Sequence, residues 1–142
     1  MQTATAQKLN NKIVGDEFEQ LFLESLMLAG HFVKQMPKGI GYDFQVGLNC
    51  TGQLWPMELK YVMGILRLSH FTLIEIAVAE EMYAAGLPYY VVYPLLSGFG
   101  VTTWAKLRGK LLNRETVVLD QAKAVMWLPS KEFMEVGRNA SI

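Results

Sequence analysis

The sequence predicts an α/β fold in which a mixed β-sheet is flanked by helices. An amphipathic helical segment comes first, short apolar segments typical of strands then alternate with helical ones, and turn residues separate the two kinds. The 142 residues suit one domain, and 51% hydrophobic with 18% charged residues predict a buried sheet, a subunit interface, or both. We therefore expect a single domain over residues 1–142, with flexible ends at 1–10 and 138–142.

The first predicted element is a helix over residues 11–29. From Phe18 onward its apolar residues recur at three- and four-residue spacing, and Gly30 is a natural stop signal. A short strand is predicted at 32–35, before a turn region rich in glycine at 37–41.

A β-hairpin is predicted next. Residues 42–48 have strand composition, 49–52 have turn chemistry, and 53–62 form the returning strand. Pro56 has no N–H to donate to a sheet. The regular part of the second strand is therefore expected to begin at Met57, or Pro56 to lie at a bulge.

The second half of the chain predicts helices and strands in alternation. An apolar helix over 68–85 is followed by glycine and proline, and a buried strand follows it. The later elements are a strand at 89–95, a loop at 97–100, a helix at 103–112, a strand at 124–128 and a helix from a Ser130 cap to Val136.

Two acids and a lysine are the candidate site. Side chains alternate along a strand, so Glu58 and Lys60 share one face, and Asp43 can approach them from the partner strand. Two converging carboxylates suit Mg²⁺ or Mn²⁺, and a neighbouring lysine can orient or deprotonate an attacking water. The alternative is an ordinary Glu–Lys pair on a solvated hairpin face. The position of the triplet inside an apolar strand favours the metal site.

The spacing of these residues resembles the motif of the PD-(D/E)XK nuclease superfamily, with fourteen residues between Asp43 and Glu58-Leu59-Lys60. The segment 15–19 (Gly-Asp-Glu-Phe-Glu) is similar to the Gly-x-x-Phe-Glu of the first helix in RecU-type Holliday-junction resolvases and their phage relatives. The layout from Tyr42 to the strand at 89–95 also follows these proteins. The resemblance covers about residues 11–95 and implies a restriction-endonuclease-like fold.

The resemblance implies a role for each matching residue. Asp43, Glu58 and the backbone carbonyl of Leu59 would bind the metal directly. Glu19 would bind it or reach it through water, and Lys60 would position the attacking water. The reaction implied is Mg²⁺- or Mn²⁺-dependent hydrolysis of DNA. From the residues themselves, Glu19 borders the apolar stripe of its helix, and an exposed helix carboxylate is the alternative.

The chain departs from the family pattern at two places. Tyr42 stands where the family name has proline. The family's helix after the lysine strand often carries Gln, or His-Gln, facing the site. Here Leu73 and Ile74 lie near that place, and the polar candidates nearby are Ser69, His70, Thr72 and Glu75. His70 is a candidate phosphate contact, with a capping or surface residue as the alternative.

DNA binding would depend on where the cations lie, because thirteen basic and thirteen acidic residues leave no net charge. The densest basic stretch, 104–114, has four cations and no acid, and the alternative for it is a solvated helix face with Trp104 in the core. The predicted DNA contacts are Lys34, Lys38, Arg67, His70, Lys106, Arg108, Lys110 and Arg114.

The function expected is thus a Mg²⁺-dependent endodeoxyribonuclease, with branched DNA such as a Holliday junction among the candidate substrates. Two alternatives stay open: a non-catalytic nuclease-fold subunit for DNA binding or assembly, and a small homodimeric interaction protein with a surface ion pair. A two-fold homodimer suits a symmetric substrate. One cysteine, no signal sequence and no membrane span predict a cytoplasmic location.

Overall fold

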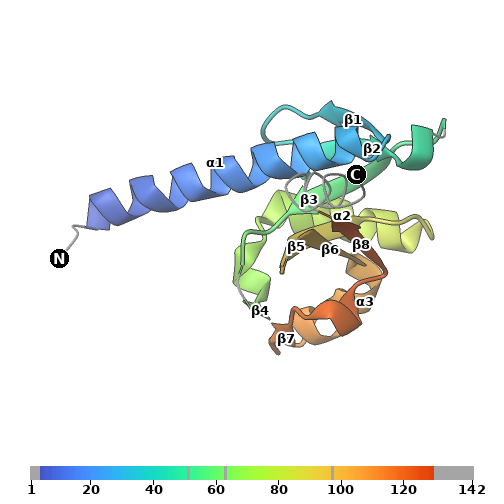
Figure 1. Ribbon diagram of the computed structural model, residues 1–142. Helices are drawn as coiled ribbons and strands as arrows, with labels where there is room; N and C mark the ends of the chain where they lie inside the picture. Colours follow the sequence, from blue (N-terminus) through green and yellow to red (C-terminus); the bar gives the residue numbers. More distant parts are fainter. Residues whose placement is uncertain (1–3, 51, 63, 97, 130–142) are drawn as a thin grey trace.

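A mixed six-stranded sheet with helices on both faces forms the body of the protein (Figure 1). The computed structural model describes residues 4–50, 52–62, 64–96 and 98–129. The strand order is β1-β2-β3-β5-β6-β8; β3 and β5 are parallel and the other neighbours antiparallel. The elements that build it are α1 (Ala4–Leu28), β1 (Phe32–Gln35), β2 (Phe44–Gly47), β3 (Trp55–Leu59), α2 (Leu73–Ala84), β5 (Tyr90–Leu95), β6 (Gly98–Thr103), α3 (Trp104–Leu112) and β8 (Met126–Pro129).

This arrangement confirms the predicted α/β class with a mixed sheet and flanking helices. A second, two-stranded sheet pairs β4 (Ile65–Leu66) with β7 (Val117–Val118), and the sequence did not predict it. No helix in the described ranges is both long and apolar enough to cross a lipid bilayer. The predicted last helix (130–136) and the predicted flexible end (138–142) lie outside the described residues.

Two hydrophobic cores lie on opposite faces of the sheet. On one face, Phe22 and Leu26 of α1 pack with Met57 and Val92. On the other face, α2 and α3 pack on the sheet around buried residues such as Tyr93. Because successive side chains of a strand point to opposite faces, neighbours in β5 serve different cores. Packing on both faces holds the strands in position, and with them the polar residues at the strand ends.

Both helix starts on the site side were predicted wrongly. The first helix begins at Ala4, so 4–10 are helical and the predicted start at Asn11 is too late. The predicted helix over 68–85 is a 3₁₀ turn, η2 (Leu68–His70), followed by α2. Thr72 starts α2 with a capping box: its hydroxyl accepts from the Glu75 N–H at 3.1 Å, and its own N–H donates to Glu75 Oε1 at 2.8 Å.

The predicted hairpin of β2 and β3 is confirmed, although both strands are shorter than predicted. Pro56 lies within the ladder opposite Gln45, so a strand start at Met57 or a bulge was wrong. The Met57 carbonyl accepts from the Asp43 N–H on the β2 side, so the nitrogen of Pro56 faces β5. Pairing with β5 begins only at Met57, and the missing N–H therefore costs no ladder bond.

The strand β6 replaces the loop predicted at 97–100. Its glycines suggested a turn, but Gly100 lies against the ring of Tyr93, which would be 2.5 Å from an added Cβ. Glycine is therefore present for close packing within a strand. The prediction of α3 is confirmed, with Thr103 as its N-cap, and the last described strand is displaced by two residues at its start from the predicted 124–128.

Candidate functional site

One pocket of about 350 Å³ brings the predicted acids together. It lies between α1, the loop before β2, strand β3 and the first turn of α2. Its lining residues are Glu19, Gln35, Met36, Pro37, Lys38, Gly39, Gly41, Tyr42, Asp43, Glu58, Thr72, Ile74 and Glu75. Glu19, Asp43 and Glu58, which are far apart in sequence, thus face one cavity.

Asp43 is fastened to β3 at two points just before β2 begins. Its N–H donates to the Met57 carbonyl at 3.0 Å, and its Oδ2 accepts from the Leu59 N–H at 2.8 Å. The N–H and C=O of one strand residue point to the same edge of the strand. The carbonyl of Leu59 is therefore directed to the side of β3 on which Asp43 lies.

Glu58 is almost fully buried, with 3% of its surface exposed. Its Oε2 is 2.8 Å from Lys60 Nζ, but its buried Oε1 has no hydrogen-bond partner among the described residues. Burial raises the pKa of the Glu58 carboxyl to about 9; the Lys60 charge opposes this shift and Asp43 adds to it. Lys60 is also buried, with only 8% of its surface exposed. The alternative of a Glu–Lys pair on a solvated hairpin face is therefore wrong.

Lys60 lies between two glutamate side chains directly after β3. Its Nζ is 2.8 Å from Glu58 Oε2, 2.9 Å from Glu75 Oε1 and 4.6 Å from the centre of the Phe71 ring. Burial alone would lower the pKa of the Lys60 amine, but the two glutamates outweigh it and raise that pKa. The group is therefore an ammonium ion at neutral pH, which can orient a water but does not accept its proton.

Glu75, one of the polar candidates near the start of α2 that was not assigned a role from the sequence, belongs to the site. Its Oε1 accepts from both Lys60 Nζ and the Thr72 N–H, and its side chain lines the pocket. Burial alone would raise the pKa of Glu75, but interactions with the neighbouring Glu58 carboxyl, with Lys60 and with the Thr72 backbone lower it. Glu75 is therefore an ionised anchor for Lys60. The signal that could have found it is the capping-box spacing Thr-x-x-Glu, which starts the helix with its first turn beside β3.

Glu19 reaches the pocket from α1, as predicted. It is half-buried, and its Oε1 accepts from Gln35 Nε2 at 3.2 Å. Burial raises its pKa, and the charge of Asp43 raises it further, so the two carboxyls interact electrostatically. Asp16, one turn earlier, is exposed.

The donor set suits a hard divalent cation, although its acids are not tightly gathered. Within the part of the chain that the structure describes, no three His, Cys, Asp or Glu side chains form a group able to hold a metal. Asp43 and Glu58 offer carboxylate oxygens, and the unpartnered Oε1 of Glu58 is the kind of buried atom that a cation would satisfy. A further ligand would come from the Leu59 carbonyl or from water.

The cations predicted to contact DNA are not alike in the structure. Lys38 lines the acidic pocket, and Lys34, Lys106 and Lys110 are exposed. Arg108 instead forms two 2.8 Å hydrogen bonds with Glu80 and lies over a tyrosine ring of α2. This guanidinium links α3 to α2, and the pairing could not be predicted because its partner Glu80 lies 28 residues away in sequence.

His70 and the two remaining arginines lie around the turn η2. The Nδ1 of His70 accepts from the Arg67 N–H at 2.9 Å, as in the capping alternative. Its Nε2 is therefore the nitrogen that carries the ring's proton when the ring is neutral. Arg67 and Arg114 line a second, smaller pocket of about 200 Å³.

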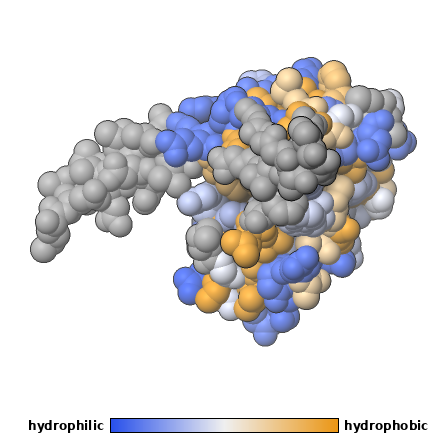
Figure 2. Space-filling view, in the orientation of Figure 1, coloured by the Kyte–Doolittle hydropathy of each residue, from blue (hydrophilic) through white to orange (hydrophobic). Residues whose placement is uncertain are grey.

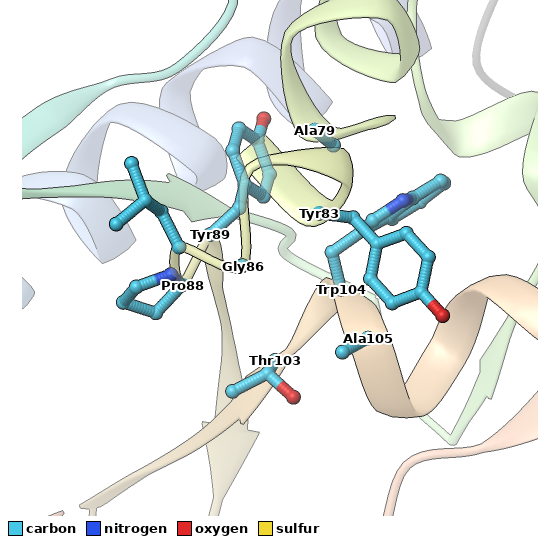
Figure 3. Close-up of a pocket in the computed structure, with 9 residues that line it drawn as sticks. Ala79, Tyr83, Gly86, Pro88, Tyr89, Thr103, Trp104 and Ala105 are labelled. Carbon is cyan, nitrogen blue, oxygen red and sulfur yellow. The ribbon is translucent and has the colours of Figure 1, made fainter. Parts of the chain in front are cut away.

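A third pocket, of about 320 Å³, is mostly apolar (Figure 3). Pro88 and Tyr89 lie on one side of it, and Tyr83 and Trp104 on the other. None of the residues that line it is an acid. Tyr89 connects it to the acidic pocket, since its hydroxyl donates to the Gly41 carbonyl at 2.6 Å. This tyrosine helps to hold the loop that carries Asp43.

No protein-family model matches this sequence, and neither does any curated protein. The chemistry of the acidic pocket is the evidence for function: two acids at adjacent strands, an ammonium ion held between two glutamates, and a buried carboxyl oxygen without a partner among the described residues.

Glu58→Gln should stabilise the fold at alkaline pH. Because the pKa of Glu58 rises from 4.5 to about 9 on folding, the unfolded chain releases this proton across that range while the folded chain keeps it. The native fold therefore loses stability as the pH rises from 4.5 to 9. Glutamine can still accept a hydrogen bond from Lys60. At pH 8 we therefore expect the free energy of unfolding of the variant to be about 1–2 kcal/mol higher than that of the native chain.

This gain should shrink towards pH 5, as measured by urea unfolding at several pH values. Glu75→Gln is the matched control. The pKa of Glu75 is lowered, so its ionised form stabilises the fold above its ordinary pKa, and its amide variant should be less stable than the native chain. A Glu58→Gln variant that is less stable than the native chain at pH 8 would show that the Glu58 charge is favourable in the fold.

Proposed function

We propose that this protein is a metal-dependent DNA endonuclease that hydrolyses phosphodiester bonds. The observation that carries the proposal is the pocket in which Asp43 and Glu58 lie together, with Lys60 clamped beside them. An apolar protein has no structural need for a buried acid whose oxygen lacks a partner, and such groups cluster where chemistry is done.

The order of the elements also supports a restriction-endonuclease-like fold. Apart from the short strand β4, which belongs to the second sheet, the chain runs α1, β1, β2, β3, α2 and β5, and these four strands are neighbours in the main sheet. The parallel pairing of β3 with β5 places Glu58 opposite Val91, in the middle of the sheet. That is the layout expected from the PD-(D/E)XK resemblance, in which the acids and the lysine lie at neighbouring strands.

Each residue of the pocket would have a separate role in the reaction. A bound Mg²⁺ or Mn²⁺ supplies charge to polarise the scissile phosphate and to lower the pKa of a water. Asp43 and Glu58 would hold it, and Glu19 would act through water, because the three acids form no tight group. Lys60, kept protonated and in place by Glu75, orients the attacking water.

A nuclease-fold subunit that binds DNA without cutting it is the second candidate. The observation that favours it is the engagement of Lys60, whose ammonium already has two carboxylate partners at 2.8 and 2.9 Å. A lysine that never leaves this clamp would not reach a water. The two candidates differ in one result, which is metal-dependent cleavage that needs Lys60.

A two-fold homodimer is part of the proposal for a symmetric, branched substrate. Large apolar side chains reach the surface, including Leu73 at 85% and Leu96 at 94% exposure. Figure 2 shows apolar surface between polar patches on the face in view. Burial of such side chains against a second copy would lower the free energy of the pair.

Incubation with a panel of branched and linear DNAs in Mg²⁺ or Mn²⁺ tests the proposed activity. The native chain should cut at least one substrate, and Asp43→Asn, which keeps the size of the side chain, should cut it at least about 10²-fold more slowly. Retention of DNA without cleavage by either protein would favour the non-catalytic subunit. A native chain that neither retains nor cleaves DNA would reject both candidates.

A further inference from the structure

The two-stranded sheet of β4 and β7 brings together two segments that each carry an arginine, below the main sheet (Figure 1). Leu66 pairs with Val117, and the residues just beyond this pair, 67–69 and 114–116, line the pocket of about 200 Å³. The sequence separates the two segments by more than forty residues. The ladder is therefore what places Arg67 and Arg114 around one cavity.

The lining of this pocket keeps a net positive charge, because it has two arginines and one acid. Neither Arg67 nor Arg114 forms an ion pair within the described ranges, although Glu115 lines the same cavity. Both arginines are exposed, and the hydroxyls of Ser69 and Thr116 also belong to residues of the lining. Two guanidinium groups and two hydroxyl donors form a set that matches the oxygens of a phosphate group.

Arg114 has a backbone conformation that suits glycine. Its φ is 63°, and it follows α3 in a Schellman motif, in which the Glu115 N–H donates to the Lys110 carbonyl at 2.9 Å and the Arg114 N–H to the Leu111 carbonyl at 3.0 Å. The other positions with positive φ in the described ranges hold five glycines and one asparagine. An arginine is strained there, so backbone stability does not explain its presence.

We propose that Arg67 and Arg114 form a phosphate-binding pocket, which holds a backbone phosphate of DNA at a place distinct from the metal centre. The inference rests on the proposed nuclease function and adds a second contact to it. Ser69 of this pocket is three residues from Thr72 of the acidic pocket, so their Cα atoms are at most about 11 Å apart. The two pockets are therefore close enough for one DNA molecule to span them.

The test is the affinity for a labelled DNA junction and a labelled duplex, measured at several salt concentrations with Ca²⁺ in place of Mg²⁺. Arg114→Gly relieves the backbone strain, so it should unfold at the native temperature or higher and yet bind DNA about 5- to 10-fold more weakly. Arg67→Gln should weaken binding similarly. In each variant the plot of log affinity against log salt should also become less steep, by about 0.9.

Lys123→Gln, which removes one charge outside this pocket, is the control and should keep the affinity within about two-fold. The proposal of a phosphate-binding pocket would be overturned if both arginine variants kept the native affinity and salt slope, or lost no more affinity than the control. It would also be overturned if Arg114→Gly were less stable than the native chain, or if the native chain did not retain DNA. Cleavage is scored separately. A native chain that binds through these arginines without cutting rejects the nuclease alone, and one that cuts with both variants unchanged rejects the pocket alone.

Discussion

Replacement of Lys60 by methionine should slow metal-dependent DNA cleavage by at least about 10²-fold, because the ammonium that holds the attacking water in place is lost. Methionine fills a similar volume beside Phe71 but offers no charge. Because Lys60 competes with a cation for Glu58 Oε2, its loss should not weaken metal binding. The measurement is single-turnover cleavage with saturating Mg²⁺, together with DNA affinity.

Loss of the Lys60 ammonium would leave the ionised Glu75 without its partner, which also costs stability, so Lys60→Arg is the second variant. Arginine keeps the charge between Glu58 and Glu75 but cannot place a single N–H donor as the ammonium does. It should fold as the native chain does and still cut poorly. Native cleavage rates in both variants would remove Lys60 from the chemistry.

Glu75→Gln should slow cleavage by about 10-fold while DNA affinity stays unchanged, because Glu75 acts through Lys60 and not on the substrate. When Glu58 binds a cation, Glu75 is the remaining anion that can hold the ammonium in place. Glu81→Gln, an exposed acid of the same helix, is the matched control and should cut at the native rate.

A double-mutant cycle distinguishes this role from a merely structural one. If Glu75 positions Lys60, its substitution should have no further effect on the cleavage rate in the Lys60→Met background, so that the two effects are not additive. Additive losses would mean that Glu75 supports the fold or contacts the substrate independently of Lys60. Thermal unfolding of each variant shows whether the assays compare folded proteins.

The part of the site built on strands could be predicted from the sequence. Alternation along a strand placed Glu58 and Lys60 on one face, and the hairpin placed Asp43 beside them. Helical spacing likewise directed Glu19 towards the sheet, where it lines the same pocket. These are local patterns, and local patterns are what a sequence displays directly.

The rest depended on contacts that sequence periodicity does not encode. The apolar run 68–85 hid the capping box of Thr72, so the helix start was misplaced and Glu75 was not assigned to the site. The bidentate partner of Arg108 lies 28 residues away in sequence. Gly100 suggested a turn because its packing against Tyr93 is visible only in three dimensions.

The most direct test of whether the two acids hold a metal is the affinity for Mn²⁺. It is measured by calorimetry without DNA on the native chain, Asp43→Asn and Glu58→Gln. We predict that the native chain binds Mn²⁺ and that each substitution weakens it at least about 10-fold, because each removes a carboxylate oxygen that the ion would bind. Equal Mn²⁺ affinity in all three proteins, or no Mn²⁺ binding by the native chain, would contradict the account.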